Sequence, residues 1–321
     1  FQAEDGIRDV RTWLEFRRVL FRSRFFYGTP SWSLVQYSFA GAHLLLALSA
    51  FVGNMIILLA LKKESSFHPP TKLLYRVLAF TDLMVGIVVI PISVIHYSSK
   101  AVENWKLCYL IGIAGYVFGV ILCGVSLSVL TAISVDRLLA LTLRLRYRQV
   151  VTIKRVQIFL LISCVQNIMN SFLPLWNARV FVVICWVCVL LCLATSTFCY
   201  LKIYWMLRKP HVRVQVRGNL PWVQQNRTFR MSMVKFKKSV SAVLWVHVVL
   251  VACYTPFTVL NLRLSLSSDM NANSTSVIGK FFSITLVYFN SSLNPIVYCW
   301  RVTEVREIVK NMLTKFSCMS R

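Results

Sequence analysis

The sequence predicts an all-α membrane protein: a seven-transmembrane helix bundle followed by an amphipathic eighth helix. Three observations predict this fold class. Of the 321 residues, 57% are hydrophobic, whereas a soluble domain is only about half apolar. Seven stretches are long enough to cross a bilayer, which takes about 20 mostly apolar residues. Lysine and arginine are concentrated on alternate connections between these stretches. Such a composition excludes intrinsic disorder and argues against a soluble nucleic-acid-binding protein.

Each apolar stretch is bounded by polar or helix-breaking residues such as Lys62-Lys63 and Lys209-Pro210. The predicted domains are an N-terminal extension (1–36), a transmembrane domain (37–300), and an eighth helix with a cytoplasmic tail (301–321). The predicted spans are Tyr37–Leu61, Leu73–Tyr97, Leu107–Thr131 (continuing to about Leu141), Val156–Leu175, Val180–Leu207, Val240–Leu264 and Val277–Trp300.

The orientation follows from the basic residues, because lysine and arginine are enriched on cytoplasmic connections. Outside residues 1–24 the chain has 30 lysines and arginines, of which 25 lie on the segments after the first, third, fifth and seventh spans or on the adjoining helix ends. The other five are Lys100, Lys106, Arg179, Arg263 and Lys280. We therefore expect a multi-pass protein of the plasma membrane with its N-terminus outside and its C-terminus in the cytosol.

Residues 1–24 form a polar, basic segment that begins with Phe1 and has no continuous apolar core, unlike a signal peptide. The segment resembles translated adapter-derived sequence at the end of an assembled transcript. An amphipathic surface helix is the other interpretation, because Ile7, Val10 and Leu14 fall on one helical face. We exclude residues 1–24 from the functional interpretation.

Two acids fall within the predicted spans, and intramembrane ionisable groups are costly and usually functional. Asp82 lies about ten residues into the second span, close to the midplane. Asp136 stands beside Arg137 at the inner end of the third span. Asn54 and Asn294 lie at similar depth to Asp82, so one shared polar cluster is geometrically feasible. For each asparagine alone, a hydrogen bond to a neighbouring helix is the simpler interpretation.

Five short sequence motifs, four of which contain the polar residues named above, lie in order on the first, second, third, sixth and seventh predicted spans. The chain resembles a class A (rhodopsin-like) G protein-coupled receptor over residues 37–315. The motifs are Gly53-Asn54, Leu78-Ala79-Phe80-Thr81-Asp82, Asp136-Arg137-Leu138, Cys253-Tyr254-Thr255-Pro256, and Asn290-Ser291-Ser292-Leu293-Asn294-Pro295-Ile296-Val297-Tyr298.

No cofactor is expected, but the resemblance implies an allosteric sodium ion. A hard cation prefers oxygen ligands, and a carboxylate with hydroxyl and amide oxygens supplies them. The residues that would surround the ion are Asp82, Ser126, Asn290, Ser291 and Asn294.

The resemblance also implies an activation mechanism and coupling to heterotrimeric G proteins and arrestin. Arg137 would pair with Asp136 at rest and turn toward the G protein on activation, while Phe236 replaces an acid that often holds this arginine, which favours raised basal activity. Two prolines within helices would supply bending points. The activation residues implied are Asn54, Asp136, Arg137, Tyr147, Tyr200, Tyr254, Pro256, Pro295 and Tyr298.

Departures from the common pattern favour one branch of the family. The connection between the fourth and fifth spans is very short and lacks cysteine, and the fifth span lacks proline. These features resemble the branch of melanocortin, cannabinoid, adenosine and lysosphingolipid receptors.

The expected ligand is small, extracellular and neutral or lipid-like, because the predicted pocket is mainly apolar with one amide. A melanocortin-like peptide and an adenosine-like purine are the alternatives. A non-signalling or constitutively active seven-helix protein is a third, and no enzymatic activity is expected. The residues placed in the pocket by family position are Val120, Cys123, Phe257, Asn261 and Tyr288.

Two modifications and one further contact are expected at the membrane surfaces. Cys318 follows the amphipathic segment from Arg301 to Leu313 and is a candidate for palmitoylation. Asn273 begins an Asn-Ser-Thr glycosylation sequon in an outer loop. Basic inner segments are expected to contact membrane lipids. No nucleic-acid partner is expected.

Overall fold

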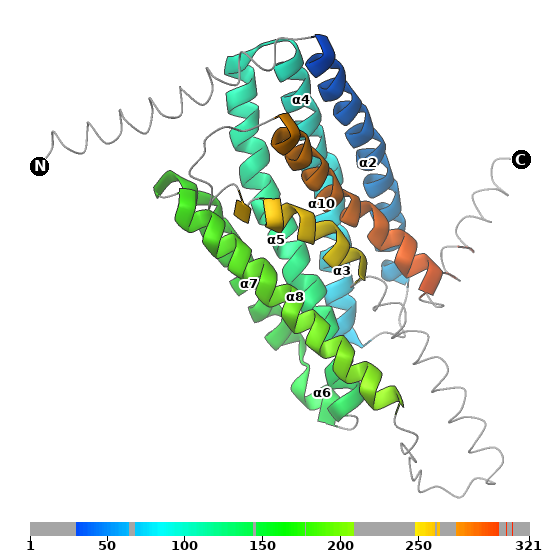
Figure 1. Cartoon of the computed structure of the whole chain (residues 1–321). Helices are drawn as coiled ribbons and strands as arrows, with labels where there is room; N and C mark the ends of the chain where they lie inside the picture. The colour runs from blue at the N-terminus through cyan, green and yellow to red at the C-terminus, as the bar shows by residue number, and fades with distance from the viewer. Residues whose placement is uncertain are drawn as a thin grey trace, which may run out of the picture.

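The computed structural model describes residues 30–63, 68–143, 146–176, 178–208, 248–260, 262–263 and 274–301, together with Arg306 and Lys310. Within these ranges the chain is almost entirely helical and contains no strand. Figure 1 shows the helices gathered into one bundle, with α6 at the end opposite to the start of α2. We call the end where α2 begins the outer end, after the predicted orientation.

The helices follow the predicted spans closely, and most extend by a few residues at each end. The predicted N-terminal extension (1–36) overlaps α2, which already begins at Pro30. Their bounds are α2 Pro30–Lys63, α3 Pro69–Met84, α4 Ile90–Ala101, α5 Trp105–Leu143, α6 Tyr147–Val150, α7 Ile153–Trp176, α8 Ala178–Arg208 and α10 Ser274–Arg301. The sixth predicted span is helical over Val248–Leu260.

The second span is not one regular helix. A π-helical turn, η1 over Val85–Val89, separates α3 from α4. Pro91 stands in the first turn of α4. Because proline has no N–H group, it cannot donate to the carbonyl one turn earlier, and the backbone accommodates this loss by a wider turn. The π turn begins three residues after Asp82.

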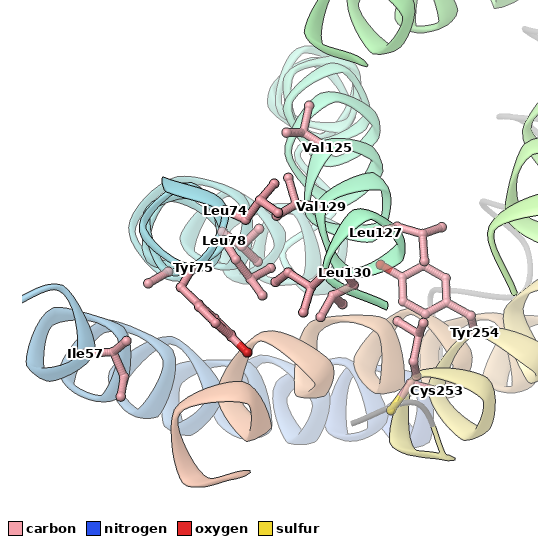
Figure 2. Packing of buried hydrophobic residues seen from close by; sticks show 14 of the residues in the cluster. Ile57, Leu74, Tyr75, Leu78, Val125, Leu127, Val129, Leu130, Cys253 and Tyr254 are labelled. Atoms are coloured by element: carbon pink, nitrogen blue, oxygen red, sulfur yellow. The ribbon is translucent and has the colours of Figure 1, made fainter. Parts of the chain in front are cut away.

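The core of the bundle lies around α5, which packs against α3, α4, α7 and α8. Figure 2 shows Leu74 and Leu78 of α3 facing Val129 of α5, with the ring of Tyr254 beside Leu127. Leu78 and Val129 are fully buried. Close-packed apolar side chains therefore hold α3, α5 and the sixth helix together.

The outward surface of the bundle is apolar. Leu45 is 72% exposed and Leu161 is 65% exposed, which a soluble protein would not tolerate over so wide a surface. Five of the described helical segments are long and apolar enough to cross a membrane, counting α3, η1 and α4 together as the one segment Pro69–Ala101. The 28-residue α10 is also long enough, although serines and asparagines interrupt it.

Small residues allow helices to approach one another at two points near Asp82. A Cβ atom on Gly53 of α2 would lie 2.9 Å from the Pro295 ring of α10. One on Gly86 of η1 would lie 3.0 Å from the Ala50 Cβ atom of α2. These contacts bring α2, η1 and α10 together, as small residues do in membrane helix packing.

Candidate functional site

Asp82 is the centre of a buried polar cluster between α3, α5 and α10. Its side chain is completely buried. The Ser126 hydroxyl of α5 donates to Asp82 Oδ1 at 3.0 Å, and the Ser291 hydroxyl of α10 donates to the same atom at 2.8 Å. Asn294 Nδ2 donates to Oδ2 at 2.7 Å. The carboxylate thus joins three helices through uncharged donors.

Asn54 extends this cluster through the backbone of Ser291, and Asn290 precedes Ser291 in α10. Asn54 Nδ2 donates to the backbone oxygen of Ala50 at 2.8 Å and to that of Ser291 at 3.0 Å. The side-chain oxygens of Asn54 and Asn290 are buried and have no hydrogen-bond partner. A buried oxygen without a hydrogen-bond partner is unfavourable. Each of these two oxygens could therefore accept a hydrogen bond from an additional donor or bind a cation.

A second acidic site lies at the inner end of α5. Arg137 Nη2 is 3.3 Å from Asp136 Oδ2, and its guanidinium carbon lies 5.8 Å from the centre of the Tyr75 ring. The Thr71 hydroxyl of α3 donates to Asp136 Oδ2 at 3.1 Å, and the Tyr147 hydroxyl of α6 donates to Oδ1 at 2.7 Å. Asp136 therefore has one cationic partner and two hydroxyl partners.

Tyr147 links the short helix α6 to this site. Its hydroxyl also lies 3.0 Å from the Thr71 hydroxyl, so the two side chains and Asp136 form a closed triangle. Burial raises the pKa of Tyr147 to about 12, and the hydrogen bond to Asp136 acts in the same direction. The phenol consequently remains protonated, and thus a donor, at physiological pH.

The sequence also matches a model of a known protein family. The family model described as 7 transmembrane receptor (rhodopsin family) matches residues 53–180 and 173–298. This chain belongs to the rhodopsin family of seven-transmembrane receptors.

The receptor is similar to adenosine receptors along most of its length. It is 23% identical to adenosine receptor A3 of Bos taurus over 302 residues, covering 86% of this chain and 89% of the relative. It is 22% identical to adenosine receptor A2b of Gallus gallus over 313 residues, covering 86% and 88%. The receptor is a multi-pass membrane protein with a seven-helix bundle, and it is not an enzyme.

Other expected activation residues lie in the core of the receptor. The Tyr200 hydroxyl on α8 is 2.8 Å from the Ser134 hydroxyl on α5, and both side chains are buried. Tyr254 is also buried. Pro256 and Pro295 both lie inside helices, where each removes one backbone hydrogen bond. The side chain of Tyr298 lies outside the described part of the structure.

The expected ligand residues come from three helices in the outer half of the receptor. Val120, Cys123 and Phe257 are half-buried. Tyr288 is buried, and its hydroxyl lies 3.0 Å from the Ser93 hydroxyl of α4. Asn261 lies outside the described residues, as do Asn273 and Cys318. Of the predicted eighth helix, Arg301, Arg306 and Lys310 are described, and all three are helical.

Several polar partners in the receptor were not predicted from the sequence. Thr71 and Ser93 belong to this group, as does the pair formed by His43 Nε2 and the Thr285 hydroxyl at 3.0 Å. His43 and Thr285 lie on α2 and α10, 242 residues apart. Only the intramembrane position of His43 marked it in the sequence, since a histidine within a span is unusual.

Proposed function

We propose that this receptor transmits the binding of a small extracellular ligand across the plasma membrane to heterotrimeric G proteins, with its N-terminus outside. The observation that carries the proposal is the set of contacts around Asp136. Arg137 is held by Asp136 and faces Tyr75, while Thr71 and Tyr147 stabilise the carboxylate from two other helices. This arrangement keeps Arg137 inside the bundle, so its release can be coupled to a change in helix packing.

The test is nucleotide exchange on a panel of purified G proteins, with the full chain in lipid nanodiscs. Arg137→Ala is expected to lower receptor-stimulated exchange about tenfold or more, since one charged contact in the transition to the coupled state is worth ~1.5 kcal/mol or more. Lys154→Ala is the matched control, because Lys154 is an exposed basic residue at the same end of the bundle. Equal exchange by both variants would contradict the proposal, as would no exchange by the parent receptor with any G protein. Arrestin binding to the same samples tests the second expected partner.

The ligand we propose has an apolar body, either uncharged or lipid-like. Val120, Cys123 and Phe257 supply an apolar lining, and the Ser93–Tyr288 pair supplies hydroxyl groups. Such a combination suits a mostly apolar ligand with few polar groups. A screen of neutral lipids with G protein activation as the readout tests this ligand class.

A purine is the second candidate ligand, and the similarity to adenosine receptors favours it. Adenosine added to the nucleotide-exchange assay distinguishes the two candidates. Activation by adenosine and not by neutral lipids would replace the first ligand class with the second.

We also propose that sodium binds beside Asp82 and stabilises the resting state. The residues fit a hard cation, since Asp82 supplies a carboxylate, Ser126 and Ser291 supply hydroxyl oxygens, and Asn290 has an unpartnered buried oxygen. Asn294 contributes in another way, because its amide nitrogen faces the carboxylate and holds it in place. A cation here would offset the cost of a buried carboxylate.

A further inference from the structure

The outer ends of α2, α4 and α10 meet in a group of side chains that the functions above do not use. Ala40, Tyr97 and Phe281 form a small buried apolar cluster separate from the main core. The Tyr97 and Phe281 rings lie 5.0 Å apart, nearly perpendicular to one another. We call this region the outer corner and define it by Gln36, His43, Tyr97, Lys100, Lys280 and Phe281.

Two lysines, 180 positions apart in the sequence, converge on this corner. Lys100 Nζ on α4 lies 5.3 Å from the centre of the Phe281 ring, and Lys280 precedes Phe281 on α10. The lysines are close enough for their charges to interact with each other and with His96. Glu103, which is exposed, is the one acid among the described residues at this end. Like charges placed together are unfavourable, and a bound anion would offset their repulsion.

Gln36 provides a second, independent observation. Its side chain is completely buried, yet neither its amide nitrogen nor its amide oxygen has a hydrogen-bond partner. Gln36 lies one helical turn before Ala40, on the face of α2 that contacts the Tyr97–Phe281 cluster. A buried amide without partners is costly. Its N–H groups are suited to donate to an oxyanion.

His43 lies on the same face of α2, deeper in the bundle. Its ring is completely buried and stands between the rings of Tyr97 and Tyr288, at 5.2 Å and 5.3 Å. Its Nδ1 atom has no hydrogen-bond partner. The corner thus extends from the half-buried Lys100 and the exposed Lys280 through aromatic rings toward Tyr288, a residue of the expected ligand pocket.

We propose that the outer corner binds the acidic group of an amphiphilic ligand, a phosphate or carboxylate, between Lys100 and Lys280. The amide of Gln36 donates to the same group, and the aromatic rings accept the adjoining apolar chain. This inference rests on the proposed apolar ligand and adds an anionic end to it.

The experiment measures thermal melting of the full receptor in phosphatidylcholine nanodiscs with dodecyl phosphate, dodecanol or inorganic phosphate. Dodecyl phosphate is expected to raise the melting temperature at lower concentration than either dodecanol or phosphate alone. Lys280→Gln should weaken its apparent affinity about tenfold, as expected for one lost charge-assisted contact. Lys100→Gln should act similarly, and Lys280→Arg should restore most of the affinity.

The matched control is Lys106→Gln, since Lys106 is an exposed outer lysine on α5 that lies outside the corner. This variant should bind dodecyl phosphate like the parent receptor. Equal responses to dodecyl phosphate and dodecanol in the parent receptor would overturn the proposal, and so would unchanged affinity in the Lys100→Gln/Lys280→Gln double variant.

A change of lipid distinguishes a bilayer headgroup from a free amphiphile as the source of the anion. A comparison of melting with nucleotide exchange distinguishes this inference from the proposed signalling. If nanodiscs containing phosphatidylglycerol remove the response of the parent receptor to dodecyl phosphate, and phosphatidylglycerol raises the melting temperature of the parent receptor but not of the double variant, the corner binds a bilayer headgroup. Persistence of the response identifies a free amphiphile. Melting requires no G protein, so failure of this inference leaves the nucleotide-exchange result with Arg137→Ala unaffected. If the parent receptor bound dodecyl phosphate but stimulated no nucleotide exchange on any G protein, only the proposed signalling would be contradicted.

Discussion

The two acids inside the spans are stabilised in opposite ways. Asp136 accepts hydrogen bonds from Thr71 and Tyr147 and is paired with Arg137. Asp82 is buried as deeply, but its three donors, from Ser126, Ser291 and Asn294, are all uncharged. The Asp136 site is electrically neutral by itself, whereas the Asp82 site carries a charge that no described side chain in contact with it neutralises.

This difference predicts different responses to the surroundings. A buried charge requires a countercharge or a proton, so the Asp82 site is expected to respond to ions in solution. The Asp136 site should respond instead to movement of the helices that supply its partners, α3 and α6. In the proposed mechanism ions bind at the Asp82 site and helix movement opens the Asp136 site, so the two acids would regulate one equilibrium through separate inputs.

The largest effect is expected from Asp136→Asn. The substitution leaves the mostly buried Arg137 without its anionic partner, which costs about 3 kcal/mol for a buried ion pair. We expect a lower melting temperature and a higher basal rate of G protein nucleotide exchange. Glu103→Gln, which removes an exposed acid, is the control and should change neither. A melting temperature and basal rate equal to those of the parent receptor would show that the pair does not hold the resting state.

A smaller and ion-dependent effect is expected from Asp82→Asn. If sodium is present at ten times its dissociation constant, it stabilises the parent receptor by about 1.4 kcal/mol. The variant should lose this gain completely, and with choline in place of sodium it should be at least as stable as the parent. Melting curves in sodium and in choline measure both quantities.

The comparison between the two acids supplies the control for the sodium experiment. Asp136→Asn is expected to keep the sodium-dependent rise in melting temperature although its overall stability is lower. If both variants lost the sodium response, the ion would act on the resting state as a whole and not at Asp82. If neither lost it, sodium would bind elsewhere.

Much of the Asp82 cluster could be predicted because its members lie at similar depths in their spans. Helix geometry converts sequence position into depth, and a polar residue in an apolar span has few alternatives to another polar residue at that depth. The structure brings Asn54, Asp82 and Asn294 together in this way. The rotation of each helix is not given by depth, which is why the unpartnered oxygens of Asn54 and Asn290 could not be predicted.

Partners outside the regular spans were harder to predict. Thr71 stands in the first turn of α3 and Tyr147 in a four-residue helix, and neither position has a distinctive pattern. The π turn had a visible cause in Pro91, but the prediction treated the second span as regular. The convergence of Lys100 and Lys280 depends on how α4 and α10 pack at the outer end. Counting the basic residues on each side of the membrane cannot predict this packing.

The smallest effect is expected from Tyr147→Phe, which removes one hydroxyl and leaves Asp136 with Thr71 and Arg137. A hydrogen bond to a charged group contributes about 1.5 kcal/mol, and part of this is recovered by the remaining donor. We therefore expect a loss of ~1 kcal/mol in the resting state, which raises basal nucleotide exchange about fivefold. Because burial raises the pKa of Tyr147 to about 12, its hydroxyl stays protonated and the effect should not vary with pH in the physiological range.

Tyr37→Phe, which alters an exposed tyrosine of α2, is the control. A rise in basal exchange equal to that of Asp136→Asn would mean that α6, and not Arg137, holds the resting state.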